Sequence, residues 1–276
     1  MQGRLLPPFK DRIHGFPADN WRLEFPLARQ AGLHCIEWIF EEPAQERNPV
    51  ANDEGIKEIK LLSSEHNVQV HSICANYYIT NRLISDDGVI RNEPFNHFLW
   101  LVERAEKLGI AYILLPFLDN SSLATQQQRE GLLSFLEKIM PTLENTGIEV
   151  NLETDFDPKT FKDILDRVDH PLVKVNYDTG NSASLGYDPL EELTLLSTKL
   201  GGVHIKDRVL GGSTVPLGTG GANFPVCFSS IAESGFDRWF ILEAARQTEM
   251  TEVELAIKNR QFIENQIDSL SNTNNS

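Results

Sequence analysis

The sequence contains few cysteines, few positive charges and no long apolar run. Its three cysteines, Cys35, Cys74 and Cys227, are an odd number without CxxC spacing, which predicts a reduced compartment and no disulfide framework. Lys and Arg number 25 against 40 Asp and Glu, and this net charge of −15 argues against a nucleic-acid groove. No stretch approaches the roughly 18 apolar residues of a membrane span, and the first residues carry no apolar signal segment. We therefore expect a cytoplasmic protein without nucleic-acid or membrane partners.

Short apolar segments alternate with longer amphipathic segments along the whole chain. The apolar segments, each expected to form a strand, are 2–6, 34–40, 68–75, 111–117, 147–153, 172–178, 201–207 and 238–244. The amphipathic segments, each expected to form a helix, are 20–31, 53–66, 95–108, 126–145, 158–168, 189–199, 224–234 and 251–268. Gly32, Gly109, Gly147 and Gly235 follow four of these helices, where a left-handed residue lets the chain turn into the next strand.

Regular alternation of strand and helix predicts a parallel sheet with right-handed crossovers, and eight such units can close on themselves. With 276 residues and 41% hydrophobic residues, the chain can build one large core. An open, doubly wound sheet is the alternative, but residues 2–20 contain no GxGxxG fingerprint. We predict an α/β protein with a single-domain (β/α)8 TIM barrel over residues 1–270 and a disordered tail over 271–276.

Four possible metal ligands lie at or near the ends of the last four expected strands: Glu153, Asp178, His204 and Glu243. The carboxyl ends of parallel strands meet on one rim of a barrel, so these side chains are expected to converge. Three carboxylates and one imidazole suit one divalent ion such as Mn²⁺, Co²⁺, Mg²⁺ or Zn²⁺. Any one of them alone could be a loop ion pair, a helix cap or a core histidine, but their joint placement favours a metal site.

Several segments of the chain resemble one known family. They are LETDF (152–156), NYDTGNSASLGYDP (176–189), VHIKDR (203–208), PLGTGGANF (216–224) and ILEAAR (241–246). With these segments the chain resembles the xylose isomerase-like TIM barrel superfamily, in its sugar-phosphate isomerase and epimerase branch, over essentially its whole length. The stretch from DTGN to GYDP is similar to ketose 3-epimerases and L-ribulose-5-phosphate 3-epimerase-like proteins. The resemblance implies that Glu153 and Glu243 are both metal ligands and the acid/base pair, and that Asp178 and His204 complete the ligand set.

The chain also departs from that family. Ketose 3-epimerases carry a substrate-binding histidine after the Asp ligand, whereas this chain has TGNSASLGY there, and their arginine beyond the His ligand comes early here, as Arg208. The sugar therefore stays open. Further candidates for substrate contact are Glu37, His71, Lys206, Arg208 and Arg246, with Asp207 as a group that orients His204. Each of these has a structural alternative, such as a core histidine, a rim carboxylate or a solvated charge pair.

The ligand set and the resemblance together predict an enzyme that moves a proton beside a carbonyl through a metal-stabilised enediolate. The leading hypothesis is an isomerase or epimerase acting on a small sugar or sugar phosphate. Backbone amides of the glycine-rich segment 211–224 could hold a phosphate, or the segment could be a plain connection. The alternatives are a dehydratase or lyase on a keto-polyol such as an inosose, a barrel similar to abasic-site endonucleases, and a sugar-binding barrel without catalysis. A homo-oligomer is compatible with the sequence.

Overall fold

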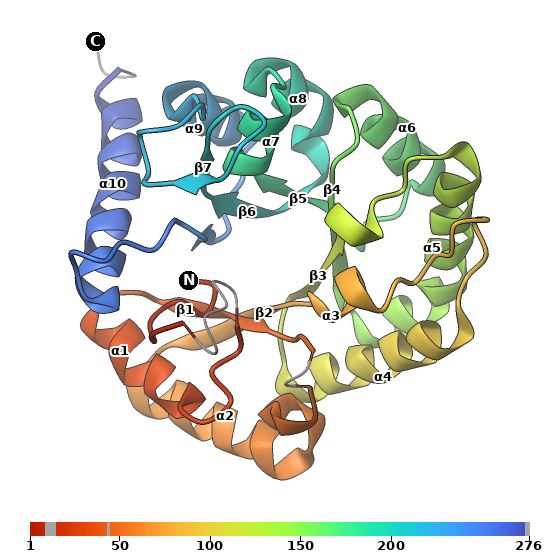
Figure 1. Ribbon diagram of the computed structural model, residues 1–276, viewed down its shortest axis with the longest axis horizontal. Helices are drawn as coiled ribbons and strands as arrows, with labels where there is room; N and C mark the ends of the chain where they lie inside the picture. The colour runs from red at the N-terminus through yellow and green to blue at the C-terminus, as the bar shows by residue number, and fades with distance from the viewer. Residues whose placement is uncertain (9–14, 43–44, 274–276) are drawn as a thin grey trace.

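The computed structural model describes residues 1–8, 15–42 and 45–273, and within them one parallel sheet curves into a nearly closed barrel (Figure 1). The strand order is β1-β2-β3-β4-β5-β6-β9, and all neighbours pair in parallel. These strands are β1 (Cys35–Ile39), β2 (Gln69–Cys74), β3 (Tyr112–Phe117), β4 (Glu149–Thr154), β5 (Val173–Asp178), β6 (Leu200–Ile205) and β9 (Phe240–Leu242). The structure therefore confirms the predicted TIM barrel.

The first expected strand, residues 2–6, is not a strand. Only Gln2 forms a parallel bridge, with Glu37 of β1, and its backbone N–H donates to the carbonyl of Leu242 in β9 at 3.0 Å. Gly3 then takes a positive φ of 41°, which turns the chain out of the strand direction. A single residue thus spans the gap between the first and last strands of the sheet.

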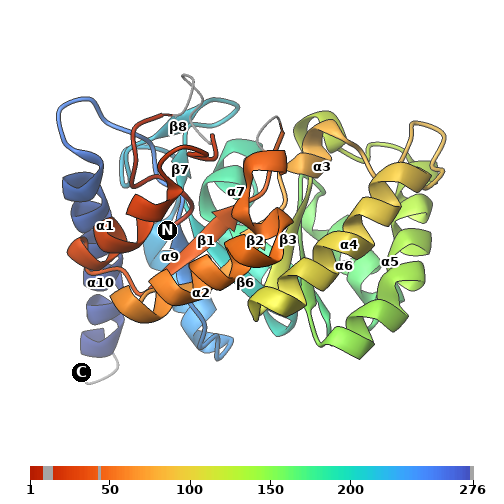
Figure 2. The same ribbon diagram turned by 90° about the horizontal axis from the view of Figure 1, so that it is seen from below.

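Helices surround the barrel, as the amphipathic segments predict (Figures 1 and 2). Those that overlap the expected segments are α1 (Glu24–Gln30), α2 (Asp53–His66), α4 (Asn92–Leu108), α5 (Gln126–Thr146), α6 (Pro158–Val168), α8 (Pro189–Leu196), α9 (Phe224–Glu233) and α10 (Glu252–Thr273). The four glycines expected after helices all have positive φ, between 70° and 82°. None of the helices in the described ranges combines the length and the apolar content of a membrane span.

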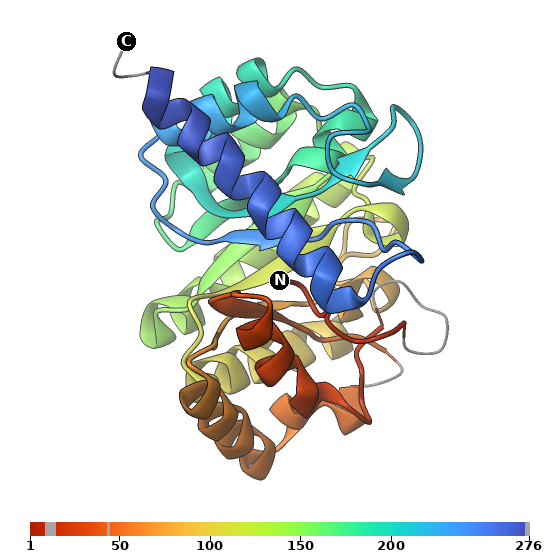
Figure 3. The same ribbon diagram turned by 90° about the vertical axis from the view of Figure 1, so that its left-hand side faces the viewer.

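The last helix, α10, runs diagonally across one side of the barrel and contacts α1 and α9 (Figure 3). It continues to Thr273, so three residues of the expected disordered tail are helical, and residues 274–276 lie outside the described ranges. In the part of the chain that the structure describes, five short 3-10 helices lie in the connections: η1 (Trp21–Leu23), η2 (Gln45–Arg47), η3 (Pro49–Ala51), η4 (Asp119–Ser121) and η5 (Ser197–Lys199).

Short elements that the sequence patterns do not predict gather at the carboxyl end of the barrel. Figure 2 shows α3 (Tyr77–Thr80), α7 (Thr179–Leu185) and a two-stranded ribbon at its upper end. The ribbon pairs β7 (Asp207–Arg208) with β8 (Thr214–Val215) in antiparallel register. The expected strand 201–207 is therefore split, because β6 ends at Ile205 and the chain turns into β7. These elements frame the end of the barrel where the predicted ligands lie.

Candidate active site

Three of the predicted metal ligands converge inside the mouth of the barrel. Glu153 lies one residue before the end of β4, Asp178 ends β5, and His204 lies one residue before the end of β6. Asp178 and His204 are partners in the β5–β6 ladder, so their side chains leave the same face of the sheet. Each of the three buried residues offers one ligand atom, and these atoms lie within 4.8 Å of one another.

Glu243, the fourth predicted ligand, joins this cluster from the end of β9. Its Oε2 lies 2.8 Å from Nδ1 of His204, and its Oε1 lies 2.6 Å from Nζ of Lys206. The same ammonium lies 2.9 Å from Oδ2 of Asp178, and Nη2 of Arg4 lies 3.1 Å from Oε1 of Glu243. Lys206 thus sits between two of the predicted ligands, and Arg4 holds the fourth in place.

The second nitrogen of His204 faces Glu37, a fully buried residue of β1. Nε2 lies 2.8 Å from Oε1 of Glu37, while Ser72 Oγ donates to the other carboxylate oxygen at 2.8 Å. Burial by itself lowers the pKa of His204, but Glu37 and then Glu243 outweigh it and raise that pKa well above its usual value. A carboxylate on one imidazole nitrogen is the usual partner of a metal-binding histidine, and it leaves Nδ1 directed at Asp178 and Glu243.

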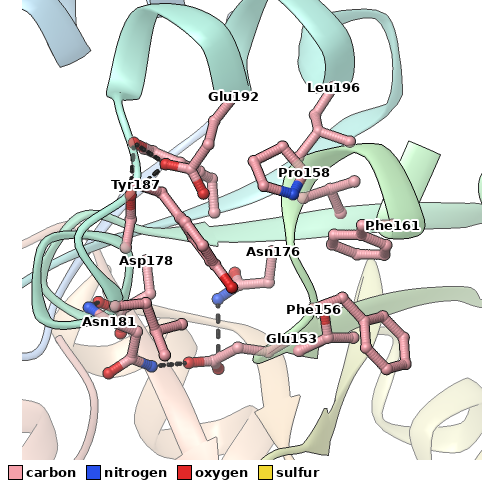
Figure 4. A pocket seen from close by; sticks show the side chains of 15 residues that line it. Glu153, Phe156, Pro158, Phe161, Asn176, Asp178, Asn181, Tyr187, Glu192 and Leu196 are labelled. Atoms are coloured by element: carbon pink, nitrogen blue, oxygen red, sulfur yellow. Dashed lines mark hydrogen bonds between the residues drawn. The ribbon is translucent and has the colours of Figure 1, made fainter. Parts of the chain in front are cut away.

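Short side chains from α7 and β5 fix the remaining carboxylates (Figure 4). Asp178 caps α7, because its Oδ1 accepts from the backbone N–H groups of Gly180 and Asn181 at 2.8 Å each. The side-chain amide of Asn181 donates to Oε1 of Glu153 at 2.6 Å, and that of Asn176 donates to Oε2 at 3.5 Å. Glu153 is therefore held at both oxygens by neutral donors.

The two glutamates differ in proton affinity because their neighbours differ. Burial, followed by the nearby charge of Asp178, raises the pKa of Glu153 to about 8. Burial alone would raise the pKa of Glu243 too, but Lys206 and His204 outweigh it and hold that pKa well below its usual value. A pair of carboxyl groups whose pKa values are pushed apart is the arrangement that lets one donate and the other accept a proton.

The chemistry of these donors suits a divalent cation. Glu153 and Asp178 supply hard oxygen ligands and His204 a borderline nitrogen ligand, all of them buried and mutually close. Glu243 adds a further carboxylate next to the imidazole. The ammonium of Lys206 among the same carboxylates indicates how strongly this part of the barrel attracts positive charge. The residues present therefore fit a divalent metal ion, and the identity of the ion stays open.

The cluster opens into a cavity of about 510 Å³ at the carboxyl end of the barrel, a volume suited to a small molecule. Glu153, Glu243 and Lys206 line it on the side of the cluster. Arg208 and Thr214 of the β7–β8 ribbon line it further out, and Asn76, between β2 and α3, lines another wall. Chemistry at the cluster is thus accessible to a ligand in this cavity.

The structure brings Arg208, but not Arg246 or His71, to this cavity. Arg246 donates to the carbonyl of Leu6 at 2.7 Å and forms an ion pair with Glu252 at 2.6 Å. His71 lies in the amino-terminal half of β2, where its ring packs edge-on against Tyr112, the first residue of β3, with 5.5 Å between centroids. Neither residue is among those that line the cavity.

Glu37 and Asp207 occupy supporting positions instead of facing the cavity. Glu37 lies behind His204, as described above, and it does not line the cavity. The buried carboxylate of Asp207 accepts hydrogen bonds from the backbone N–H groups of Gly218, Gly220 and Ala222 at 2.8 to 3.0 Å. These partners belong to the glycine-rich loop, so Asp207 organises that loop and occupies the amides that could otherwise hold a phosphate.

Sequence reasoning missed two contacts of the site. Asn181 contacts Glu153 from the first turn of α7, and Arg4 contacts Glu243 from the amino-terminal segment. The signal for Asn181 lies in the DTGN stretch, because an aspartate that caps a helix brings the side chain three residues later near its own. No signal in the sequence predicts the contact of Arg4, which joins residues 239 positions apart.

The chain belongs to the xylose isomerase-like TIM barrel family, whose model matches residues 25–266. It is 22% identical over 238 residues to L-ribulose-5-phosphate 3-epimerase UlaE of Shigella flexneri serotype 5b, covering 83% of each chain. It is 25% identical over 228 residues to inosose dehydratase of Bacillus anthracis, covering 72% of this chain and 76% of the relative. The similarities support an enzyme and leave the type of reaction open.

A solved structure shares the fold. The crystal structure of IolI protein with a bound zinc atom matches 91% of this chain and 94% of its own, with a TM-score of 0.74 and 18% identity. At this identity the likeness shows the fold alone.

Proposed function

We propose that the protein is a divalent-metal-dependent isomerase or epimerase of a sugar or sugar phosphate. The observation that carries the proposal is the pairing of Glu153 and Glu243, two buried carboxylates with opposite pKa shifts that both line one cavity and both contact one ligand cluster. Relatives that are epimerases and a zinc-containing structure of the same fold support it.

The residues of the site have separable roles in this proposal. Glu153, Asp178, His204 and Glu243 hold the ion, which when bound acts as a Lewis acid toward the substrate carbonyl. Glu153 and Glu243 then take and return the proton on the carbon beside that carbonyl. Asn181 and Asn176 keep the carboxylate of Glu153 aimed into the cavity. The site is buried, and in such a site preorganised charges are most effective at stabilising the negative charge that develops on the substrate oxygens.

The substrate in this proposal carries an anionic end group that binds Arg208. The guanidinium donates to Oδ1 of Asn181 at 2.9 Å and twice to the carbonyl of Gly212, at 3.0 and 2.8 Å, which are neutral acceptors. Within the described ranges no carboxylate forms an ion pair with Arg208, so its charge is uncompensated where it lines the cavity. Arginine pairs strongly with phosphate and carboxylate groups.

The test is proton exchange in D₂O, followed by NMR, with protein reconstituted with Mn²⁺ and a panel of ketoses, ketose phosphates and inososes. Isomerisation or epimerisation predicts deuterium at the carbon beside the carbonyl of one panel member, together with a rearranged sugar of unchanged composition. We expect kcat/KM to be higher for a ketose phosphate than for the corresponding neutral sugar. Arg208→Met is expected to lower kcat/KM for the phosphate about ten- to a hundredfold and so to remove that preference. No exchange with any ketose would refute the proposal.

A dehydratase on a keto-polyol is the second candidate, and the similarity to inosose dehydratase favours it. The same proton abstraction then ends in loss of the β-hydroxyl as water. The two reactions separate cleanly in the same assay, because dehydration lowers the product mass by one water whereas epimerisation preserves it. The cluster and its acid/base pair would serve either reaction.

A further inference from the structure

Asn181 connects the arginine at the cavity wall to the carboxylate at the cluster. Its Nδ2 donates to Oε1 of Glu153 at 2.6 Å, and its Oδ1 accepts from Nη1 of Arg208 at 2.9 Å. The residue sits in the first turn of α7, where its backbone N–H donates to Oδ1 of Asp178 at 2.8 Å. One side-chain amide thus spans the distance between the site of charge recognition and the site of proton transfer.

The polarity of this amide leaves it a single favourable orientation. If the amide turned over, its carbonyl would face the carboxylate of Glu153 and its NH₂ would face the guanidinium of Arg208, and both contacts would be repulsive. Charge-assisted hydrogen bonds on both sides therefore fix the same rotamer. Removing either partner removes half of the constraint on Asn181.

Arg208 is itself anchored by the β7–β8 ribbon. Its Nε and Nη2 both donate to the carbonyl of Gly212, and its own carbonyl accepts from the N–H of Gly221 at 2.8 Å. A guanidinium has five N–H groups, of which three are used in these bonds, so two remain for an anion without displacing Asn181. The link to Glu153 can therefore persist while Arg208 binds a substrate.

We propose that Asn181 is a positioning residue through which Arg208, the group that recognises the anionic end of the substrate, also orients the carboxylate of Glu153. The inference rests on the proposed function in taking Glu153 as a metal ligand and acid/base group. It predicts that Arg208, although it touches no ligand of the cluster, contributes to metal affinity, and that this contribution passes entirely through Asn181.

The test is a double-mutant cycle on Mn²⁺ affinity, measured by calorimetry on chelator-stripped protein at one pH, so that no substrate or turnover is needed. Asn181→Leu preserves the side-chain shape and is expected to weaken Mn²⁺ binding about 10- to 100-fold, the scale for partners that orient a ligand. Arg208→Met is expected to weaken it roughly 2- to 10-fold, and the double variant is expected to match Asn181→Leu alone.

Two further variants separate positioning from a general structural effect. Arg208→Lys keeps a donor for Oδ1 of Asn181 and is expected to recover most of the affinity that Arg208→Met loses. Arg129→Met removes an arginine that also donates to a backbone carbonyl, that of Ala124, but on α5 away from the cavity, and is expected to change nothing. Thermal unfolding midpoints verify that each variant is folded, and Asn181→Ala replaces the leucine variant if that one is not.

Two results would overturn the inference. One is a wild-type affinity for Mn²⁺ in Arg208→Met, and the other is a loss of affinity in the double variant equal to the product of the two single losses. Crystal structures of the wild type and Arg208→Met give an answer that does not depend on metal: an unchanged Asn181 to Glu153 hydrogen bond in the variant would also overturn it. Failure of the proposed function gives a different result. The wild type and the variants would then show the predicted Mn²⁺ affinities, but the wild type would exchange no proton in any ketose.

Discussion

Oε1 of Glu37 lies 2.8 Å from Nε2 of His204, and both side chains are fully buried. Ser72 Oγ and the hydroxyl of Tyr112 donate to the other oxygen of Glu37, at 2.8 and 3.4 Å, so the carboxylate cannot turn away without leaving buried donors unpaired. Nε2 faces Glu37, and Nδ1 is the nitrogen that faces Asp178 and Glu243. In the proposed metal site, Nδ1 would therefore be the nitrogen that binds the ion, and Glu37 would orient the imidazole.

Glu37→Gln is expected to lower the affinity for Mn²⁺ or Zn²⁺ by about 10- to 100-fold, since the amide keeps the shape but not the charge that fixes the imidazole. Calorimetric titration of the stripped protein measures this directly. Glu65→Gln, an exposed glutamate of α2, is the matched control and should behave as the wild type. Equal affinity in Glu37→Gln and the wild type would mean that another group orients His204.

Glu153→Gln and Glu243→Gln are each expected to lower turnover at least about 10²-fold, the scale for loss of a general acid or base. Steady-state rates on the substrate found in the D₂O screen provide the measurement, at saturating metal so that weakened metal binding is not mistaken for lost chemistry. Glu130→Gln, on the outer surface of α5, is the control. Turnover at the wild-type rate in both site variants would place the acid/base role on other residues.

Metal affinity is expected to rise with pH up to about 8. Burial and then Asp178 raise the pKa of Glu153 to about 8, so below that pH the carboxyl is protonated and must lose its proton to bind a cation. Glu243, whose pKa is lowered, contributes no proton over the same range. His204, whose pKa is raised, also carries a proton that a bound cation displaces. With both groups protonated, affinity should increase by more than tenfold, and up to about a hundredfold, per pH unit between pH 6 and 8.

Calorimetry in two buffers of different ionisation enthalpy checks this by counting protons released per Mn²⁺ at pH 7. We expect nearly two protons from the wild type, one each from Glu153 and His204, and about one from Glu153→Gln. A proton count that is the same in the wild type and in Glu153→Gln would show that Glu153 is already ionised in the metal-free protein.

The barrel itself could be predicted from the sequence because its signals are local. The expected helices 53–66 and 158–168 match α2 and α6 residue for residue, since each starts at a capping side chain: Asn52 accepts from the N–H of Gly55, and Asp157 from that of Thr160. The prediction of a strand at residues 2–6 was wrong because the signals that decide the structure there are not local. The apolar character of this segment suggests a strand, but pairing there depends on partners in β1 and β9 that are far away in sequence.

The convergence of the four candidate ligands was likewise predictable, because parallel strands carry their last residues to one rim whatever their order in space. The supporting residues were not. Asn181 belongs to α7, which is too short for a periodic pattern to reveal, and Asp207 points into the glycine-rich loop only because β6 ends at Ile205 and the chain turns into the ribbon. Such contacts depend on turns whose direction the hydrophobic pattern does not encode.

Glu192 is a buried carboxyl group away from the cluster (Figure 4). Glu192 of α8 accepts hydrogen bonds from Ser182 of α7 and from the hydroxyl of Tyr177 in β5, the latter at 3.2 Å. Burial raises its pKa to about 7, although both hydrogen bonds act in the other direction. Glu192 therefore joins α7, the helix that carries Asn181, to the outer helix α8.

The pH dependence of stability follows from the sign of this shift. A carboxyl whose pKa is higher in the folded than in the unfolded chain favours the folded state while it is protonated. Its contribution is therefore complete below pH 4.5 and is lost as the pH rises to about 7, by about 3 kcal/mol in total. Glu192→Gln stays neutral throughout, so its stability relative to the wild type should increase with pH over this window.

Denaturant unfolding of both proteins at pH 5 and pH 8 measures that difference. Other buried acids, such as Glu24, are present in both proteins and cancel in the comparison. Glu137→Gln, an exposed position on α5, provides the baseline for a glutamate that does not join two helices. A difference in unfolding free energy between Glu192→Gln and the wild type that is the same at both pH values would mean that Glu192 ionises in the folded protein as it does in the unfolded chain, and that its hydrogen bonds to Ser182 and Tyr177 compensate fully for burial.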